Sequence, residues 1–430
     1  MMLRPAALLR SPLSVQARPD PAGLLLLLGV YVALLAGRFT LPVSGVLEDL
    51  DLRFVFVYGL ALGVAAWSTT WRGTQQVAGS AGVGPGSRWF AAWCGLLALA
   101  SFWASPGARV GSALVDVFFL LVFAVAAWTI ASRLTSAQLT RVWLWLIVTA
   151  AVYLVLALYV GPGAQNRYSA PGGGPNVFVR VMIVGALAAL CRYRTSGRMW
   201  WLAFIPFFAV GALLSGSRGG LLSAAIVFLL AGIPVFRSLG LRWAVLCLLT
   251  VPLTTVAVLE VLSRGTAVFQ FLRDRYLTQT LTARYGSGRD TIAEQALAVF
   301  SRHPWLGAGL DGYYASQSVG PRFEYPHNLV LATLAETGLV GGTLLAAALI
   351  AFGVSASRAR PVPDNALFFL IAGVYLFFAS MFSGDYYDSR MMWFFLGLAA
   401  VEGRRHRRGT RRAPAAGGLA APTNRLPPSA

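Results

Sequence analysis

The residues best suited to chemistry lie in one long polar stretch, positions 287 to 342, of an otherwise apolar chain. Two of the three histidines, His303 and His327, fall within it. His327 follows a proline and precedes a long hydrophobic run, so we expect it at the mouth of a membrane-spanning helix. An imidazole there can act as a general base near neutral pH. The alternative is an interfacial histidine bonded to a headgroup or to the backbone. His303, within HPWLG, is predicted to be a structural turn residue.

An arginine begins the helix that this stretch predicts. Arg289 precedes apolar residues at helical spacing, and Ser287 and Asp290 offer oxygens for capping the helix. A guanidinium and the free N–H groups of a helix start could bind an anion together. The alternative is a solvated arginine beside a cap. The apolar positions of this helix are Ile292, Ala293, Ala296, Leu297, Val299 and Phe300.

Two further arginines fall at depths where charge is costly. Arg218 occupies a very short hairpin, SGSRGG, and Arg180 lies about one turn inside a hydrophobic segment. Ionisable groups at membrane depth usually face a polar cavity, so these arginines predict a cationic cavity. We predict catalytic roles for His327, Arg289 and Arg218. The remaining candidates, for substrate binding, are Arg167, Asn176, Arg180, Arg264, Asn328 and Glu336.

The acidic residues and cysteines suggest no metal or cofactor. No cluster of His, Cys, Asp or Glu has metal-ligand spacing, and neither a Walker sequence nor a dinucleotide fingerprint occurs. Glu336 is as well explained as a buried partner of arginine or backbone groups. Asp116 is an intramembrane acid with an arginine as its expected partner, and the roles of Asp385 and Asp388 stay open. The three cysteines, expected to be packing residues, are Cys94, Cys191 and Cys247.

The elements that position these residues are predicted to be membrane-spanning helices. The chain of 430 residues is 57% hydrophobic and 12% charged, with a mean hydropathy of +0.66. Soluble domains carry about 25% charged residues, so the composition predicts an all-α polytopic membrane bundle. Counted against the ~20 residues needed to cross a bilayer, the apolar segments give about twelve spans, of which the first, third and last are short. They lie near 21–37, 52–70, 89–105, 110–131, 142–160, 176–192, 199–215, 220–236, 243–262, 328–353, 365–383 and 389–402.

The arginines also predict the orientation of the bundle. The net charge is +19, every basic residue is arginine, and most arginines flank hydrophobic segments, so we expect no nucleic-acid partner. Their alternation predicts both termini in the cytoplasm and the cationic cavity on the outer face of the cytoplasmic membrane, toward the periplasm or the outside. We divide the chain into membrane segments 1–262 and 328–403, a catalytic loop 263–327, and a disordered basic tail 404–430.

Several of these segments together resemble the bacterial O-antigen ligase and O-antigen polymerase superfamily. The matching pieces are SGSRGG with Arg218, SGRDTIAEQALAVFSRHPWLGAGL with Arg289, and PHNLVLATLAETGLVGG with His327. A weaker upstream pattern matches Arg167 and the Pro175-Asn176 pair. The resemblance covers roughly the second half of the chain.

The resemblance implies a metal-independent membrane glycosyltransferase without a cofactor or nucleotide. Its donor would be a glycan on undecaprenyl diphosphate, and its acceptor a hydroxyl of a glycan or of lipid A core. By residue match, Arg218 and Arg289 would be the essential arginines and His327 the essential histidine. Because arginine binds a diphosphate through two parallel hydrogen bonds, it can stabilise the leaving group without magnesium. In-line attack by the acceptor would invert the anomeric carbon.

Other functions remain open at this point. Ligase and polymerase share the motifs, so the acceptor separates them. A lipid-glycan transporter or flippase would also need cavity charges, but usually near the bilayer midplane and with repeated halves. Here the charges gather at one face and no repeat is visible. A structural scaffold for a glycan-assembly complex is a further alternative.

Overall fold

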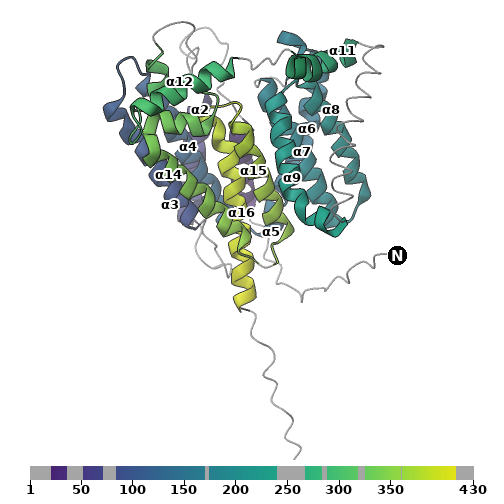
Figure 1. Ribbon diagram of the computed structural model, residues 1–430. Coiled ribbons are helices and arrows are strands. Elements are labelled where there is room, and N and C mark those ends of the chain that lie inside the picture. Colours follow the sequence, from purple (N-terminus) through teal and green to yellow (C-terminus); the bar gives the residue numbers. More distant parts are fainter. Residues whose placement is uncertain are drawn as a thin grey trace, which may run out of the picture.

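The chain folds into a bundle of helices (Figure 1). The computed structural model describes residues 21–35, 52–70, 84–169, 174–239, 267–282, 288–317, 325–359 and 361–412, and these ranges contain no strand. The larger helices are α1 (Pro21–Leu35), α2 (Leu52–Thr70), α3 (Pro85–Leu99), α4 (Val110–Arg133), α6 (Arg141–Val160), α7 (Pro175–Ser196), α8 (Phe204–Leu214), α9 (Arg218–Leu239), α12 (Arg289–Arg302), α14 (Leu329–Ser357), α15 (Asp364–Ser380) and α16 (Arg390–Arg412). The short ones are α5 (Ser136–Leu139), α11 (Ala267–Arg273), α13 (Gly312–Ala315), the 3₁₀ turns η1 (Ala100–Trp103), η2 (Ala164–Asn166), η3 (Met199–Ala203) and η5 (Tyr387–Ser389), and the π-helix η4 (Asp274–Thr282).

The helix lengths identify a membrane protein. Four helical segments of the described chain are long and apolar enough to cross a bilayer: α4, the α5–α6 segment, α7 and α14. Shorter apolar helices accompany them, including α1, α15 and the start of α9. Helices coincide with every predicted span except 243–262, which lies outside the described residues. The predicted number of twelve is not confirmed, because several of these helices are shorter than the ~20 residues that a crossing needs.

Helices α15 and α16 lie between two groups of helices (Figure 1). On one side α15 packs against α7 and α9, and α7 in turn packs against α6 and α8. On the other side α16 packs against α4 and α14, and α14 packs against α3. Buried aromatic rings fill the second group, and the Trp128 indole donates a hydrogen bond to the Trp393 carbonyl at 3.0 Å. This scaffold carries the α12 and α11 end of the bundle, opposite the C-terminal end of α16.

The C-terminal helix extends beyond its predicted boundary. Helix α16 continues to Arg412, so the prediction of a disordered tail from position 404 is wrong for residues 404–412, while 413–430 lie outside the described residues. Arginine is a good helix former, and so the helix does not need to stop where the apolar residues end. Arg405 also donates hydrogen bonds to the carbonyls of Ala131 and Leu134 and pairs with Glu402.

Helix α14 is broken near its start, a feature that the sequence analysis did not predict. Gly338 has φ 62° and ψ −158°, which interrupts the helix. The turn at 303–309 packs into the break and supplies partners for its backbone groups. The amide of Ala308 donates to the Ala335 carbonyl at 2.9 Å, and the amide of Leu339 donates to the Pro304 carbonyl at 2.8 Å. The HPWLGAGL and ETGLVGG motifs therefore form one structural unit.

A glycine makes this close contact possible. Gly307 has φ +68°, and a Cβ atom there would lie 2.2 Å from the Glu336 carbonyl carbon. We predict that Gly307→Ala destabilises the protein, because a left-handed alanine costs roughly 1–2 kcal/mol and the backbone of α14 must also move. The check is the temperature at which the monodisperse peak is lost in fluorescence-detected size-exclusion chromatography.

A matched control separates the two costs. Gly197 also has φ +68°, but nothing lies within 4 Å of a Cβ atom built there. Gly197→Ala should therefore show the backbone cost alone, with a smaller fall in melting temperature. Equal falls for the two variants would contradict the tight contact with α14.

Candidate active site

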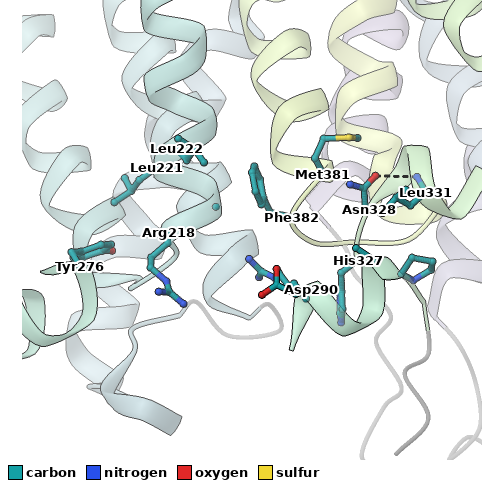
Figure 2. A pocket seen from close by; sticks show the side chains of 14 residues that line it. Arg218, Leu221, Leu222, Tyr276, Asp290, His327, Asn328, Leu331, Met381 and Phe382 are labelled. Carbon is teal, nitrogen blue, oxygen red and sulfur yellow. Dashed lines mark hydrogen bonds between the residues drawn. The ribbon is translucent and has the colours of Figure 1, made fainter. Parts of the chain in front are cut away.

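A cavity of about 570 Å³ lies where the start of α9, the start of α12 and the segment before α14 meet. Arg218, Arg289 and His327 all line it, and we call it the histidine cavity. Figure 2 shows Arg218 and His327 on opposite sides, with Asp290 between them. Apolar side chains, among them Leu222 and Phe382, line another part of the wall. Three residues predicted from separate motifs thus share one cavity.

The arginine of the SGSRGG hairpin begins a helix. The hairpin turns at Gly216, where φ is +62°, and Arg218 is the first residue of α9. The Ser215 hydroxyl accepts a hydrogen bond from the Ser217 amide at 3.1 Å, which holds the turn. Arg218 is half-buried, with its side chain at the cavity.

Arg289 begins α12, as predicted, but the helix start is capped differently. The N-cap residue is Gly288, with φ 71° and no side-chain cap, so the predicted capping by Asp290 is wrong, while Ser287 lies outside the described residues. Asp290 instead lies in the first turn. The apolar face of α12 packs against α14 and fixes the helix start at the cavity. Burial, followed by the nearby charges of Arg218 and Arg275, lowers the pKa of Arg289 below its ordinary value.

A second cavity, of about 230 Å³, shares Arg218 and Arg289 with the first. Arg167 and Arg275 also line it, and we call it the arginine cavity. Within the described part of the chain, no acidic side chain lines it. Burial first, and then the surrounding arginines, lower the pKa of Arg167 to about 10. Arginine side chains are charged at neutral pH, so four positive charges face one small space, and an anion would be strongly attracted.

The sequence analysis did not single out Arg275. It lies on η4 and is buried, and its Nε donates to the Gly216 carbonyl at 3.0 Å. Tyr276 beside it donates its hydroxyl to the Leu213 carbonyl at 2.8 Å, and burial raises the pKa of this tyrosine. Both contacts join η4 to the hairpin that carries Arg218. Only the three-dimensional fold identifies Arg275, because it stands in the sequence among other loop arginines.

His327 is held in an unusual backbone conformation. Its φ is +54°, a region that residues other than glycine rarely adopt. The Tyr325 ring meets the imidazole edge to face, with 4.4 Å between the ring centroids. On the other side, the Asn328 side-chain oxygen caps α14 by accepting from the amides of Val330 and Leu331, each at 3.0 Å. Strained residues of this kind cluster at functional sites.

Two of the candidate binding residues have mainly structural contacts. The Asn328 oxygen is taken up by the helix cap, although the residue lines the histidine cavity. Arg180 is buried and donates to the carbonyls of Ala379 and Ser383, so it joins α7 to the end of α15. It lines neither the histidine cavity nor the arginine cavity. Its cost of burial is offset by backbone carbonyls instead of by a substrate.

Asn176 and Arg167 do come together at the arginine cavity. The Asn176 oxygen accepts a hydrogen bond from the Ser217 hydroxyl at 2.8 Å, and its amide donates to the Ser383 hydroxyl at 3.0 Å. Arg167 donates to the Ser215 carbonyl at 2.9 Å. Arg264 lies outside the described residues.

The acidic candidates gather elsewhere. Glu336 is buried and accepts a hydrogen bond from the Tyr386 hydroxyl at 2.9 Å. It lines a third cavity, together with Asp116 and Asp385, and does not line the histidine cavity. Asp388 pairs with Arg390 at 3.4 Å instead. Among the described residues, no group of three or more His, Cys, Asp or Glu could hold a metal ion.

The remaining predictions concern structural residues. His303 ends α12 as its C-cap residue and is exposed, in agreement with a role in the turn. Cys94 and Cys191 are free and buried, as expected of packing residues, and Cys247 lies outside the described ranges.

Comparison with known families gives one match to this region. Residues 201–346 match the family model described as O-antigen ligase, which confirms the similarity that the motifs predict. The matched range contains Arg218, Arg289 and His327 as well as the unit formed by α12 and the broken start of α14. A comparison with curated proteins found no match.

Proposed function

We propose that this membrane protein is a glycan ligase of the O-antigen ligase and polymerase superfamily, because residues 201–346 match the O-antigen ligase family model. It transfers a glycan from undecaprenyl diphosphate to an acceptor hydroxyl. The observation that carries the proposal is the cavity that Arg218, Arg289 and His327 line together, with Arg218 and Arg289 also lining the neighbouring arginine cavity.

The arginine cavity binds the diphosphate of the donor. Four guanidinium groups and the start of α12 face this space, and arginine matches two phosphate oxygens at once. As the bond between the sugar and the phosphate breaks, negative charge grows on the leaving oxygen. Positive charge that is already in place stabilises that growing charge more than it stabilises the ground state. The arginines thus do the work that a metal ion does in other transferases.

His327 acts as the general base in this mechanism. The acceptor hydroxyl loses its proton to the imidazole as its oxygen attacks the anomeric carbon of the donor. The new bond joins the acceptor oxygen to that carbon, and the bond to the phosphate oxygen breaks with its electron pair. The products are the extended acceptor, protonated His327 and free undecaprenyl diphosphate. Attack opposite the leaving group inverts the anomeric configuration.

The apolar wall of the histidine cavity suits the lipid part of the donor. Leu221, Leu222 and Phe382 line it beside the arginines. The polyprenyl chain can stay in the membrane while its diphosphate reaches the cavity. We assign the site to the periplasmic face of the cytoplasmic membrane, with both termini in the cytoplasm, because the arginines that flank the spans follow the positive-inside rule on that orientation.

Purified protein in detergent, supplied with a lipid-linked glycan and an acceptor, tests the proposal. A transferase consumes the donor and releases the free lipid diphosphate without a sealed membrane. A transporter or flippase leaves the donor intact in detergent and moves it only across a closed bilayer. An intact donor after long incubation with acceptor would therefore overturn the enzyme assignment. An acceptor that itself carries the lipid diphosphate and is elongated would identify a polymerase.

Chelation of metal ions is predicted to have little effect on this reaction. Since the arginines already neutralise the diphosphate, transfer in excess EDTA should proceed at nearly the untreated rate. Initial rates with EDTA, and with added magnesium, check this prediction. Strong inhibition by EDTA, reversed by magnesium, would show that a metal ion carries part of the charge.

A further inference from the structure

A third cavity adjoins the histidine cavity across the segment that carries the proposed base. It measures about 250 Å³. Pro326 lines both cavities, Tyr325 lines the third, and His327 lines the first. The imidazole therefore belongs to a short segment with a cavity on each side. An acceptor could therefore approach His327 from the third cavity, on the side away from the donor's diphosphate.

The chemistry of the third cavity is opposite to that of the arginine cavity. Asp116, Asp311, Glu336 and Asp385 line it, and we call it the carboxyl cavity. Arg109 is the one arginine among its described lining residues, and it already pairs with Asp311. Its Nε and Nη2 donate to the two carboxylate oxygens at 3.1 and 3.2 Å. Among the described lining residues, carboxyl groups thus outnumber arginines by four to one.

This lining selects the class of ligand. Carboxylates repel a phosphate, so the donor's diphosphate does not belong here. The acids are also not arranged as metal ligands anywhere in the described chain. Carboxylates accept strong hydrogen bonds from neutral hydroxyl groups, and the Ser112 and Tyr386 hydroxyls add further polar positions. Tyr325 contributes an aromatic ring, whose face is apolar like that of a sugar.

The wall of the carboxyl cavity is rigid, as a specific binding site requires. Asp311 is buried at φ +56°, and the Arg109 amide also donates to its carboxylate at 2.7 Å. The Arg109 guanidinium lies 3.7 Å from the centre of the Tyr314 ring. The Glu336 carboxyl group is held by the Tyr386 hydroxyl, and its backbone carbonyl accepts a hydrogen bond from the Gly309 amide at 3.1 Å. Arg109, Asp311 and Glu336 therefore have little side-chain freedom left to lose on binding.

We infer that the carboxyl cavity is the acceptor subsite and that it binds an uncharged, polyhydroxylated sugar. This inference rests on the proposed function. The volume is below the ~300–1,000 Å³ of typical ligand pockets, which suits one sugar unit of a longer acceptor. The hydroxyl to be glycosylated passes Pro326 and reaches His327, while the diphosphate lies among the arginines. The arginines favour the diphosphate of the donor in the arginine cavity, and the carboxyl groups favour the neutral sugar of the acceptor in the carboxyl cavity.

Photolabelling tests the binding site without relying on catalysis. The full chain is placed in lipid nanodiscs, because glycoside detergents would compete, and is exposed to a neutral disaccharide that carries a diazirine. We expect labels on peptides that contain Asp116 or Asp385, and much weaker labelling with the same disaccharide bearing a phosphate. Equal labelling by both probes, or labels confined to peptides outside the cavity, would overturn the inference.

Substitutions then measure the effect on transfer. Asp116→Asn and Asp385→Asn, each made alone, should raise the acceptor KM by about tenfold or more, as expected for a lost hydrogen bond to a charged group. The donor KM should stay unchanged. Asp388→Asn is the matched control, because Asp388 pairs with Arg390 and does not line the cavity. Size-exclusion chromatography checks that each variant folds. If one of the two variants fails to fold, the other still tests the inference.

The outcomes separate this inference from the proposed function. An unchanged acceptor KM in both variants, or a rise in the donor KM alone, would reject the acceptor subsite while leaving the transferase intact. Absence of any transfer by the unmodified protein would reject the transferase. The photolabelling would then still report whether the cavity prefers the neutral sugar.

Discussion

Replacing His327 by asparagine is expected to lower the rate of glycan transfer by on the order of 10²–10⁴-fold, the usual contribution of a general base. Asparagine keeps the backbone conformation, because it is among the residues that tolerate positive φ, and His327 has φ +54°. It cannot accept the hydroxyl proton at neutral pH. Alanine should abolish transfer as well, with expression retained, but it adds a backbone cost. Steady-state rates at saturating donor and acceptor give the comparison.

His303→Ala provides the control for this prediction. His303 ends α12, is exposed, and does not line the histidine cavity. Its loss should leave transfer close to the unmodified rate. Undiminished transfer by well-folded His327→Asn would remove His327 from catalysis. A fall in donor affinity with unchanged turnover would instead make it a binding residue.

Exchange of Arg289 or Arg218 for lysine is the second change for which we expect a large effect. Lysine keeps one positive charge but loses the planar fork that binds two phosphate oxygens at once. Since charge on the leaving diphosphate grows in the transition state, turnover should fall more than donor binding. We expect a loss on the order of 10²–10³-fold, as for a removed transition-state donor. Transfer rates and donor binding are measured for each variant.

Arg302→Lys is the matched control on the same helix. Arg289 is the first residue of α12 and Arg302 the last, and the exposed Arg302 lines none of the three cavities. This variant should transfer glycan normally. Full activity in both Arg218→Lys and Arg289→Lys would refute two-point binding, because a point charge would then suffice.

The proposed reaction would use two differently charged cavities, which lie on either side of the segment that carries His327. Arginines converge from α9, α12 and η4, whereas carboxyl groups converge from α4, α14 and the segment after α15. None of these helices carries a complete site. In the proposed reaction, the distance between donor and acceptor depends on the packing of α12 against the broken start of α14. The Gly307 and Gly338 contacts would then be part of the framework of the proposed active site.

Much of the helical fold follows from the sequence, because helix formation in a membrane depends on local properties. A run of apolar residues, bounded by arginine, proline or glycine, must satisfy its backbone hydrogen bonds internally. Helices accordingly occur where the apolar runs predicted them, within the described residues. The break at Gly338 was not predictable in this way, since its stability comes from the distant turn at 303–309.

The candidate site was likewise predictable only in part. Residue chemistry and short motifs identified Arg218, Arg289 and His327, because charge or an imidazole beside an apolar span is costly without a purpose. The local sequence pattern did not predict that Arg180 donates its hydrogen bonds to the carbonyls of Ala379 and Ser383. It also did not predict that Arg275 lines the arginine cavity. The sequence also did not predict that four carboxyl groups line one cavity together with Pro326. Sequence alone determined which side chains are costly to bury, while only the tertiary structure decided which of them share a space, since that depends on how distant segments pack.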